Sequence, residues 1–363
     1  MLLPGKRFPR FLSLDVFRGI TIILMILVNS PGNKTVYSWL AHSVWHGCTL
    51  ADIVFPFFIF IVGVTSVLSL AKSRQQGLSN NLPKIVQRTL IIFLIGLFLN
   101  LFPYHFDLST IRFFGVLQRI AICYFCISLL YLTTRIQTQI VIFISLLIGY
   151  WLLMTVVPAP GYGAGNLTPE GNWASCVDRM IFSSPHLYGK IFDPEGLLST
   201  LPAIATALLG SFTGIWLIST NNPRRQLTGL FIAGILGVVT GWVWGLWFPI
   251  NKSLWTSSYV LFTGGLALIV FAICYWLLDV KGYKKWGKPF EVLGLNAMAA
   301  YFLHIFFLKV QLMVPGNLRL LVTDRLFGWS ALENASLFYA LGYSLLWLLV
   351  LTVFYRKRIF LKV

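Results

Sequence analysis

The chain has 363 residues, of which 57% are apolar and only 11% are charged, with a formal net charge of +17 and a mean hydropathy of +0.79. Soluble domains usually carry about a quarter of their residues as charges, so this composition excludes an ordinary soluble protein and indicates an integral membrane protein. A basic excess can indicate nucleic-acid binding, but charged loops flanking membrane helices explain it here, and we predict no nucleic-acid partner.

A membrane-spanning helix needs roughly 20 apolar residues to cross about 30 Å of hydrocarbon. Ten runs of this kind follow one another, and they predict an all-α, polytopic transmembrane helix bundle in a single domain, residues 1–363. The runs cover residues 13–30, 52–71, 88–102, 113–132, 138–157, 197–218, 227–248, 257–278, 291–312 and 335–355. No small-residue cleavage site follows the first run, so we expect a retained helix rather than a signal peptide.

Lysine and arginine are concentrated in alternate loops of this predicted bundle. Short basic loops stay on the cytoplasmic side, so we predict that both termini are cytoplasmic and that the loop carrying His42 lies outside. Eighteen of the 28 basic residues would then lie inside, namely Lys6, Arg7, Arg10, Lys72, Arg74, Lys84, Arg88, Arg135, Arg224, Arg225, Lys281, Lys284, Lys285, Lys288, Arg356, Lys357, Arg358 and Lys362.

One connection, residues 158–196, is much longer than the others and lies outside in this topology. Long loops in compact domains are usually functional or disordered. The aromatic residues Trp173, Phe182, Tyr188 and Phe192 favour a folded cap over the outer face, and a solvated loop is the alternative.

The cysteines and histidines predict neither a disulfide framework nor a metal centre. A C-x-x-C spacing begins at Cys123, inside a predicted membrane helix where cysteines simply pack. A bridge between Cys48 and Cys176, both outside, stays open because spacing alone cannot show that two cysteines are close. His42 and His46 are four residues apart, but no acidic cluster completes a metal-binding set.

Titratable and polar residues are costly in hydrocarbon, so those in and beside the spans need a reason. In the first two runs and the loop between them these residues are Asp15, Arg18, Asn29, His42, His46 and Asp52. We predict that this stretch forms or faces an active site. Asp15 and Arg18, three residues apart, could equally be a structural ion pair.

Two later runs also carry polar residues. Gln118 and Arg119 lie near the outer third of the fourth run, and a buried arginine there predicts a water-filled cavity. Asn296, Tyr301 and His304 lie loosely on one face of the ninth run and predict a polar stripe along a pore, although a lone buried histidine is more often a packing residue.

A series of motifs resembles the heparan-α-glucosaminide N-acetyltransferase family. In chain order they are SLDVFRG, ILVNSPG, LAHSVWHGCTLADIVFPFFIFIVG, GVLQR, FDPEG, NKSLWTSSYV, LNAMAAYFLH and FYRKRIF, covering nearly all the chain from about Arg10. The resemblance implies a polytopic enzyme that passes acetyl from cytoplasmic acetyl-CoA to an amino sugar across the membrane. It places the essential histidine at His42 and the active-site asparagine at Asn29. It also implies a compact relative in a bacterial cytoplasmic membrane, without the luminal region and first membrane helix of the animal enzyme.

The predicted catalytic residues suit this chemistry. Only a neutral amine attacks a thioester, so the site needs a proton acceptor near pH 7, and histidine is poised there. Asn29 could donate a hydrogen bond to the developing oxyanion, and Asp52 could orient His42. Whether His42 is itself acetylated stays open, and direct transfer is the simpler expectation.

Further residues are predicted to hold the substrates. Those predicted to bind substrate are Arg18, Gln118, Arg119, Asp193, Glu195, Asn296, Tyr301 and His304. Lys284 and Lys285 could bind the coenzyme phosphates, or the basic loops could serve topology and anionic lipid alone. The alternatives to this function are an O-acyltransferase of a surface polysaccharide and a transporter of an anionic or sugar solute. An apolar outer face could also serve as a homodimer contact.

Overall fold

The computed structural model describes residues 10–103 and 109–361, and every extended regular element in them is helical. The longer helices are α1 (Leu12–Asn29), α2 (Leu50–Leu70), α3 (Gly77–Leu101), α4 (Val116–Thr133), α5 (Ile136–Thr155), α6 (Trp173–Phe182), α7 (Thr200–Ser219), α8 (Pro223–Trp244), α9 (Ser257–Tyr275), α10 (Lys288–Leu295), α11 (Ala297–Met313), α12 (Leu318–Phe327) and α13 (Leu332–Arg356). Within these described ranges, nine helical segments are long and apolar enough to cross a membrane, and the bent pair α10–α11 would make a tenth. The predicted all-α polytopic bundle is confirmed.

Two predicted spans differ from the observed helices. Helix α3 begins at Gly77, well before residue 88, although its first turns are polar and contain poor helix formers such as Gly77 and Pro83. A side-chain contact supports this end, because Asn81 donates to the Ser73 carbonyl (2.9 Å). The ninth run is broken at Asn296, where α10 and α11 meet at an 80° bend. The Asn296 side chain donates to the Ile359 carbonyl (3.2 Å) and accepts from the Leu361 N–H (3.2 Å). Asn296 itself has non-helical backbone angles, and its side chain ties the break to the C-terminal segment.

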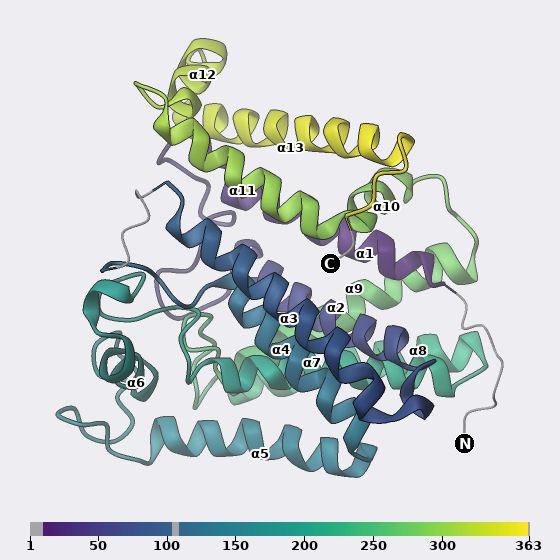
Figure 1. Cartoon of the computed structure of the whole chain (residues 1–363). Helices are drawn as coiled ribbons and strands as arrows, with labels where there is room; N and C mark the ends of the chain where they lie inside the picture. Colours follow the sequence, from purple (N-terminus) through teal and green to yellow (C-terminus); the bar gives the residue numbers. More distant parts are fainter. Residues whose placement is uncertain (1–9, 104–108, 362–363) are drawn as a thin grey trace.

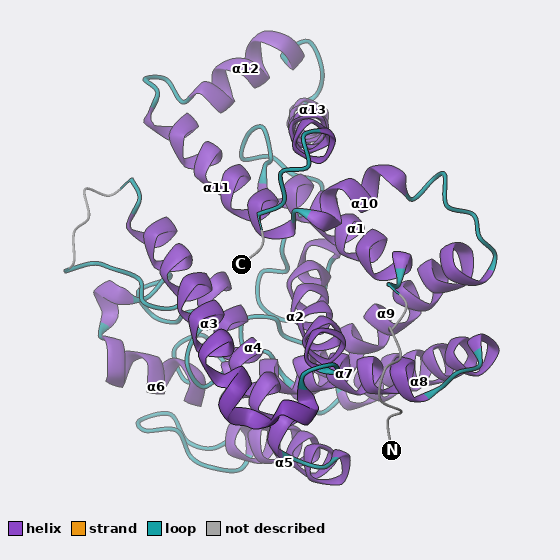
Figure 2. Ribbon diagram, turned by 45° about the vertical axis from the view of Figure 1, so that its right-hand side comes forward, coloured by secondary structure: helices purple, strands orange, loops and turns teal. Residues whose placement is uncertain are grey.

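Helix α2 packs along α7 at the centre of the larger group of helices, which Figure 2 shows below α10 to α13. The two backbones touch because glycines face each other. A Cβ atom on Gly63 would lie 2.0 Å from the carbonyl oxygen of Ala207, and one on Gly210 would lie 2.0 Å from that of Phe60. Small residues of this kind allow close helix packing where lipid offers no hydrophobic driving force. Helices α1 and α10 form a second close pair.

The chain enters and leaves the described bundle at one end, which we call the Arg10 end. Arg10 pairs with Glu291 in the first turn of α10 (3.3 Å), and Lys288 donates to the Tyr355 hydroxyl near the end of α13 (2.7 Å). Which side of a membrane this end faces stays a prediction, and Lys6, Arg7 and Lys362 lie outside the described residues.

The opposite end, which we call the His42 end, is covered by residues 158–196. Helix α6 in this segment stands at the left of Figure 1. Asn172 caps it by accepting from the Ser175 N–H (2.8 Å). The Trp45 indole N–H donates to the Leu167 carbonyl (2.8 Å), so the segment is bound to the loop that carries His42.

Candidate active site

A cavity of about 790 Å³ lies among α1, α2, α3, α4 and α11, and we call it the central cavity. Its lining on α2 extends from Ala51 to Thr65, which corresponds to about 20 Å along a helix axis. On α1 it is lined by Arg18, Met25 and Asn29, which share one face of the helix. The cavity therefore passes most of the way from the Arg10 end to the His42 end, against a hydrocarbon thickness of about 30 Å.

The three predicted catalytic residues line the same end of this cavity. Asn29 is the last residue of α1, His42 lies in the following loop, and Asp52 lies in the first turn of α2. They lie near each other because one loop, residues 30–49, joins two helices that pack together. Their cavity neighbours at the His42 end are Ser43, Arg112, Tyr188, Phe192, Pro194, Glu195, Lys252 and Ser253.

Asp52 organises this end although it has no exposed surface. Its Oδ1 lies 2.8 Å from Nδ1 of His42, and its Oδ2 accepts from the Ser43 N–H (3.0 Å), the Thr49 N–H (3.1 Å) and the Thr49 hydroxyl (3.0 Å). The first turn of a helix also favours a carboxylate through its free N–H groups and dipole. When His42 donates Nδ1–H to Asp52, its Nε2 is left as a basic nitrogen. The His42 side chain is 47% exposed and so can meet a substrate.

Lys252 was not among the predicted site residues, yet it contacts both members of this pair. Its Nζ lies 3.0 Å from Nδ1 of His42 and 3.4 Å from Oδ1 of Asp52. The one available signal was its place in the motif NKSLWTSSYV, a lysine flanked by polar residues just before a membrane helix.

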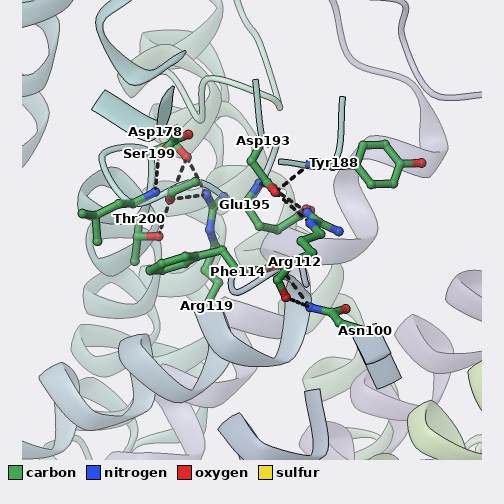
Figure 3. Close-up of polar contacts among 12 residues, drawn as sticks. Asn100, Arg112, Phe114, Arg119, Asp178, Tyr188, Asp193, Glu195, Ser199 and Thr200 are labelled. Carbon is green, nitrogen blue, oxygen red and sulfur yellow. Dashed lines mark hydrogen bonds and ion pairs between the residues drawn. The ribbon is translucent and has the colours of Figure 1, made fainter. Parts of the chain in front are cut away.

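The cap contributes an ion cluster at the mouth of the cavity, shown in Figure 3. Arg112 donates to Asp193 (2.7 Å) and pairs with Glu195, and its guanidinium lies 4.8 Å from the centre of the Tyr188 ring. Burial alone would lower the pKa of Arg112, but the two carboxylates raise it above its usual value. Of the two predicted acids, Glu195 lines the cavity, whereas Asp193 holds Arg112 and the backbone of the cap.

Gln118 and Arg119 do not line the central cavity, although their neighbours Leu117 and Ile120 do. Both Gln118 and Arg119 are buried, and Arg119 donates to the Gly196 carbonyl (3.1 Å) and to the Ser199 hydroxyl (2.5 Å). Its guanidinium lies 4.9 Å from the centre of the buried Trp255 ring. This arginine therefore anchors the cap to the bundle through Nη2 and the cation–π contact, as Figure 3 shows for Ser199, while its Nε and Nη1 have no hydrogen-bond partner among the described residues.

The predicted polar stripe of the ninth run is interrupted, because the break at Asn296 changes the direction of the helix. Tyr301 lines the cavity, but Asn296 bonds the C-terminal segment. His304 is fully buried on α11, and its Nδ1 contacts the Ala300 carbonyl (3.2 Å). These contacts match the alternative interpretation of a lone buried histidine, that of a packing residue.

Toward the Arg10 end the cavity is lined by Arg18 and Arg88, together with Thr65, Tyr124, Gly294 and Leu361. Arg18 donates to the Gly294 carbonyl (3.1 Å) and lies 3.6 Å from Asp15, so the structural ion pair exists and its arginine still faces the cavity. Arg88 lies over the Tyr124 ring at 4.7 Å. Lys284 and Lys285 are exposed and do not line the cavity.

The remaining candidates lie apart from this geometry. His46 Nδ1 lies 3.4 Å from the Asn251 amide nitrogen and does not line the cavity. Cys48 and Cys176 are both free, so the bridge that stayed open is not formed. In the ranges that the structure describes, no group of three or more His, Cys, Asp or Glu side chains could hold a metal ion.

Comparisons with known proteins agree with the resemblance in the motifs. The model of the family "Heparan-alpha-glucosaminide N-acetyltransferase, catalytic" matches residues 10–240. The chain is 31% identical over 419 aligned positions to the Homo sapiens protein named heparan-alpha-glucosaminide N-acetyltransferase, and 30% identical over 418 to that of Mus musculus. Each alignment covers 98% of this chain and 60% of the relative, so the chain spans about 60% of the length of the curated relatives it matches. The chain belongs to the heparan-α-glucosaminide N-acetyltransferase family.

Proposed function

We propose that the chain is an acetyltransferase that moves acetyl from acetyl-CoA, bound from the Arg10 end, to the amine of a glucosamine-type sugar at the His42 end. One observation carries this proposal. A single cavity joins two arginines at one end to a histidine–carboxylate pair at the other. The names of the two curated relatives, which specify N-acetyl transfer involving α-glucosaminide, support the reaction class.

The donor fits the Arg10 side of the cavity by charge and polarity. Coenzyme A carries phosphates, and arginine binds phosphate through two parallel, charge-assisted hydrogen bonds. Arg18 and Arg88 are placed for this, and apolar residues such as Phe58 and Ile92 line the path that an extended thiol arm would follow. We retain Lys284 and Lys285 only as exposed charges that attract the anionic coenzyme before it binds.

The acceptor fits the His42 side. An amino sugar arrives as an ammonium ion, which a carboxylate attracts. Burial alone would raise the pKa of Glu195, but the positive charges of Arg112, Arg119 and Lys252 lower it, so Glu195 stays ionised at the cavity wall. The aromatic rings of Tyr188 and Phe192 lie beside it and offer apolar area to a sugar ring.

The transfer then needs one base and one oxyanion donor. Nε2 of His42 first takes one proton from the ammonium and releases it to solvent. The neutral amine nitrogen then forms a bond to the thioester carbonyl carbon, and Nε2 takes a second proton from this nitrogen. The Asn29 amide donates to the carbonyl oxygen as it becomes negative. When the carbon–sulfur bond breaks, the thiolate of coenzyme A leaves and can take the proton held by His42. The products are an N-acetyl sugar and coenzyme A, without an acetyl-histidine intermediate.

The reaction can be tested on purified protein with acetyl-CoA and glucosamine, by measuring free coenzyme A thiol and the mass of the sugar product. N-acetylglucosamine formed together with thiol supports the proposal. Acetylation of a sugar that has hydroxyls but no amine would favour the O-acyltransferase. Sugar movement without thiol release would favour the transporter, which leaves the His42–Asp52 pair unexplained.

We further propose that the chain works in a bacterial cytoplasmic membrane with the Arg10 end inside. This rests on the distribution of basic residues between the two ends. A cysteine at Lys34 should react with an impermeant reagent added to intact cells, and one at Tyr283 only after lysis. The reverse pattern would overturn the orientation.

A further inference from the structure

We propose that Lys252 is a positioning residue whose ammonium disfavours the imidazolium form of His42, so that Nε2 is free to act as the base. This inference rests on the proposed function of His42. It concerns a residue outside the Asn29, His42 and Asp52 set, and it explains why a lysine lies against a histidine that has to accept a proton.

Asp52 and Lys252 compete at Nδ1 of His42, one as an acceptor and the other as a donor. Nδ1 of His42 lies 2.8 Å from Oδ1 of Asp52, and Nζ of Lys252 lies 3.0 Å from the same Nδ1. If Nδ1 accepted from Lys252, two acceptors would face each other at 2.8 Å with no proton between them, which is repulsive. A proton on Nδ1 lies near the ammonium, but it can be donated to the carboxylate over the shorter of the two contacts, so we assign Nδ1–H to the bond with Asp52. The ammonium then serves as a charge and donates to Oδ1 of Asp52 (3.4 Å).

Lys252 is held in this place by a rigid turn, Pro249–Thr256, which we call the Lys252 turn. Asn251 accepts from the Leu254 N–H (2.9 Å), and the Gly47 N–H donates to the Ile250 carbonyl (2.7 Å), which ties the turn to the His42 loop. Trp255 has a φ of +53° although it is bulky and fully buried. Such a conformation is strained and persists only where the surroundings enforce it, which is common at functional sites. The Lys252 side chain itself is only 18% exposed.

The charge of Lys252 affects the balance between the neutral and the protonated form of His42. Asp52 favours the imidazolium, and an ammonium at 3.0 Å opposes it, because two positive charges repel at short range. The other charged or titratable groups around the pair are His46 and Cys48 on the same loop, Arg112 and Glu195 from the cap, and Tyr259 of α9, whose hydroxyl donates to the Asp52 backbone carbonyl. None of these lies closer to Nδ1 in any contact that the described residues make. Without the ammonium, Asp52 should therefore be the main influence on the protonation of His42 and should favour the imidazolium.

The direct test is nuclear magnetic resonance of the full chain in detergent with isotopically labelled histidine, since the sequence has 5 histidines. His42→Ala assigns the His42 signal. In Lys252→Gln the pKa of His42 should rise by about one unit, because His42 is half exposed and solvent weakens the full Coulomb effect. In Lys252→Arg it should stay near the wild-type value. Lys34→Gln, which removes an exposed lysine of the same end, should not move it. Nitrogen shifts of the wild type should report a proton on Nδ1.

A shift below about 0.3 units in Lys252→Gln, a downward shift, or a proton on Nε2 in the wild type would overturn the proposal. If Lys252→Gln does not fold, Lys252→Met is the second neutral variant, because its unbranched stem fills similar space. The acid limb of kcat/KM for acetyl transfer should move with the histidine pKa. The transfer assay and the histidine spectrum distinguish failure of the proposed function from failure of the proposed role of Lys252. Absence of transfer in the wild type would remove the proposed function, whereas the spectroscopic shift tests Lys252 alone.

Discussion

Replacement of Asp52 by asparagine is the most informative single change at the site, because it keeps the shape of the side chain and removes its charge. Oδ1 faces His42 and Lys252, and Oδ2 faces the Ser43 N–H and both donors of Thr49. An amide has one acceptor and one donor group. In either orientation its NH₂ group meets donors, so Asp52→Asn cannot satisfy both sides of the site.

Two effects follow, and their sizes can be worked out from these contacts. Leaving a buried donor unsatisfied costs about 1 to 3 kcal/mol, and hydrogen bonds to charged groups contribute about 1.5 to 3 kcal/mol each. We therefore expect a loss of unfolding free energy of about 2 to 4 kcal/mol. Loss of the group that orients a histidine base lowered kcat about 10⁴-fold in the serine-protease example of this arrangement, so we expect a fall of about 10² to 10⁴.

The assay is acetyl transfer at saturating acetyl-CoA and sugar, together with thermal unfolding in detergent. Asp279→Asn is a matched control, because Asp279 accepts from the Leu12 N–H (3.3 Å) and the Ser13 N–H (3.1 Å) at the Arg10 end, far from His42 along α1. It should lose stability but keep its kcat. A folded Asp52→Asn that retains more than about a tenth of wild-type kcat would refute the orienting role of Asp52.

Three further changes have defined outcomes. His42→Ala should lose about 10² to 10⁴ in kcat while acetyl-CoA binding, measured by calorimetry, is kept; His46→Ala should keep its activity, and the opposite ranking would contradict the proposed base. Arg88→Gln should raise the KM for acetyl-CoA and flatten the salt dependence of that KM, with little change in kcat, whereas Lys284→Gln should change the KM less. Equal changes of KM in the two variants would contradict a donor site inside the cavity. Burial raises the pKa of Asp178 to about 7, so its protonated form stabilises the fold at low pH and this contribution is lost as the pH rises through 7. Asp178→Asn should therefore melt progressively higher than the wild type between pH 5 and pH 8, and a constant difference would show that this carboxyl does not titrate there.

The sequence predicted the helices well where hydropathy and helix formation agree. It missed the first turns of α3, where Lys84 and other polar residues form a helix that lipid cannot surround. It also missed the break at Asn296, which depends on hydrogen bonds to residues about 60 positions later in the chain. No local pattern contains such a contact.

The candidate site could be predicted where one loop joins two packed helices. Asn29, His42 and Asp52 came from that stretch, and the structure brings all three to one end of the central cavity, while their catalytic roles remain proposals. Lys252 could not be found by spacing, because it reaches the site from 210 residues away. The surroundings of Arg119 also depend on distant segments. A buried arginine in a span has the same sequence pattern whether it faces water or a carbonyl and an aromatic ring from distant segments.

Transfer between the two ends of one cavity is the central claim, and sealed vesicles containing the purified protein test it most directly. Acetyl-CoA, which does not cross the bilayer, is added outside, and glucosamine is trapped inside. Molecules whose Arg10 end faces outward should form N-acetylglucosamine inside the vesicles and release coenzyme A outside, and vesicles with His42→Ala should form neither. Product that forms only when acetyl-CoA and glucosamine are on the same side of the membrane would contradict the account.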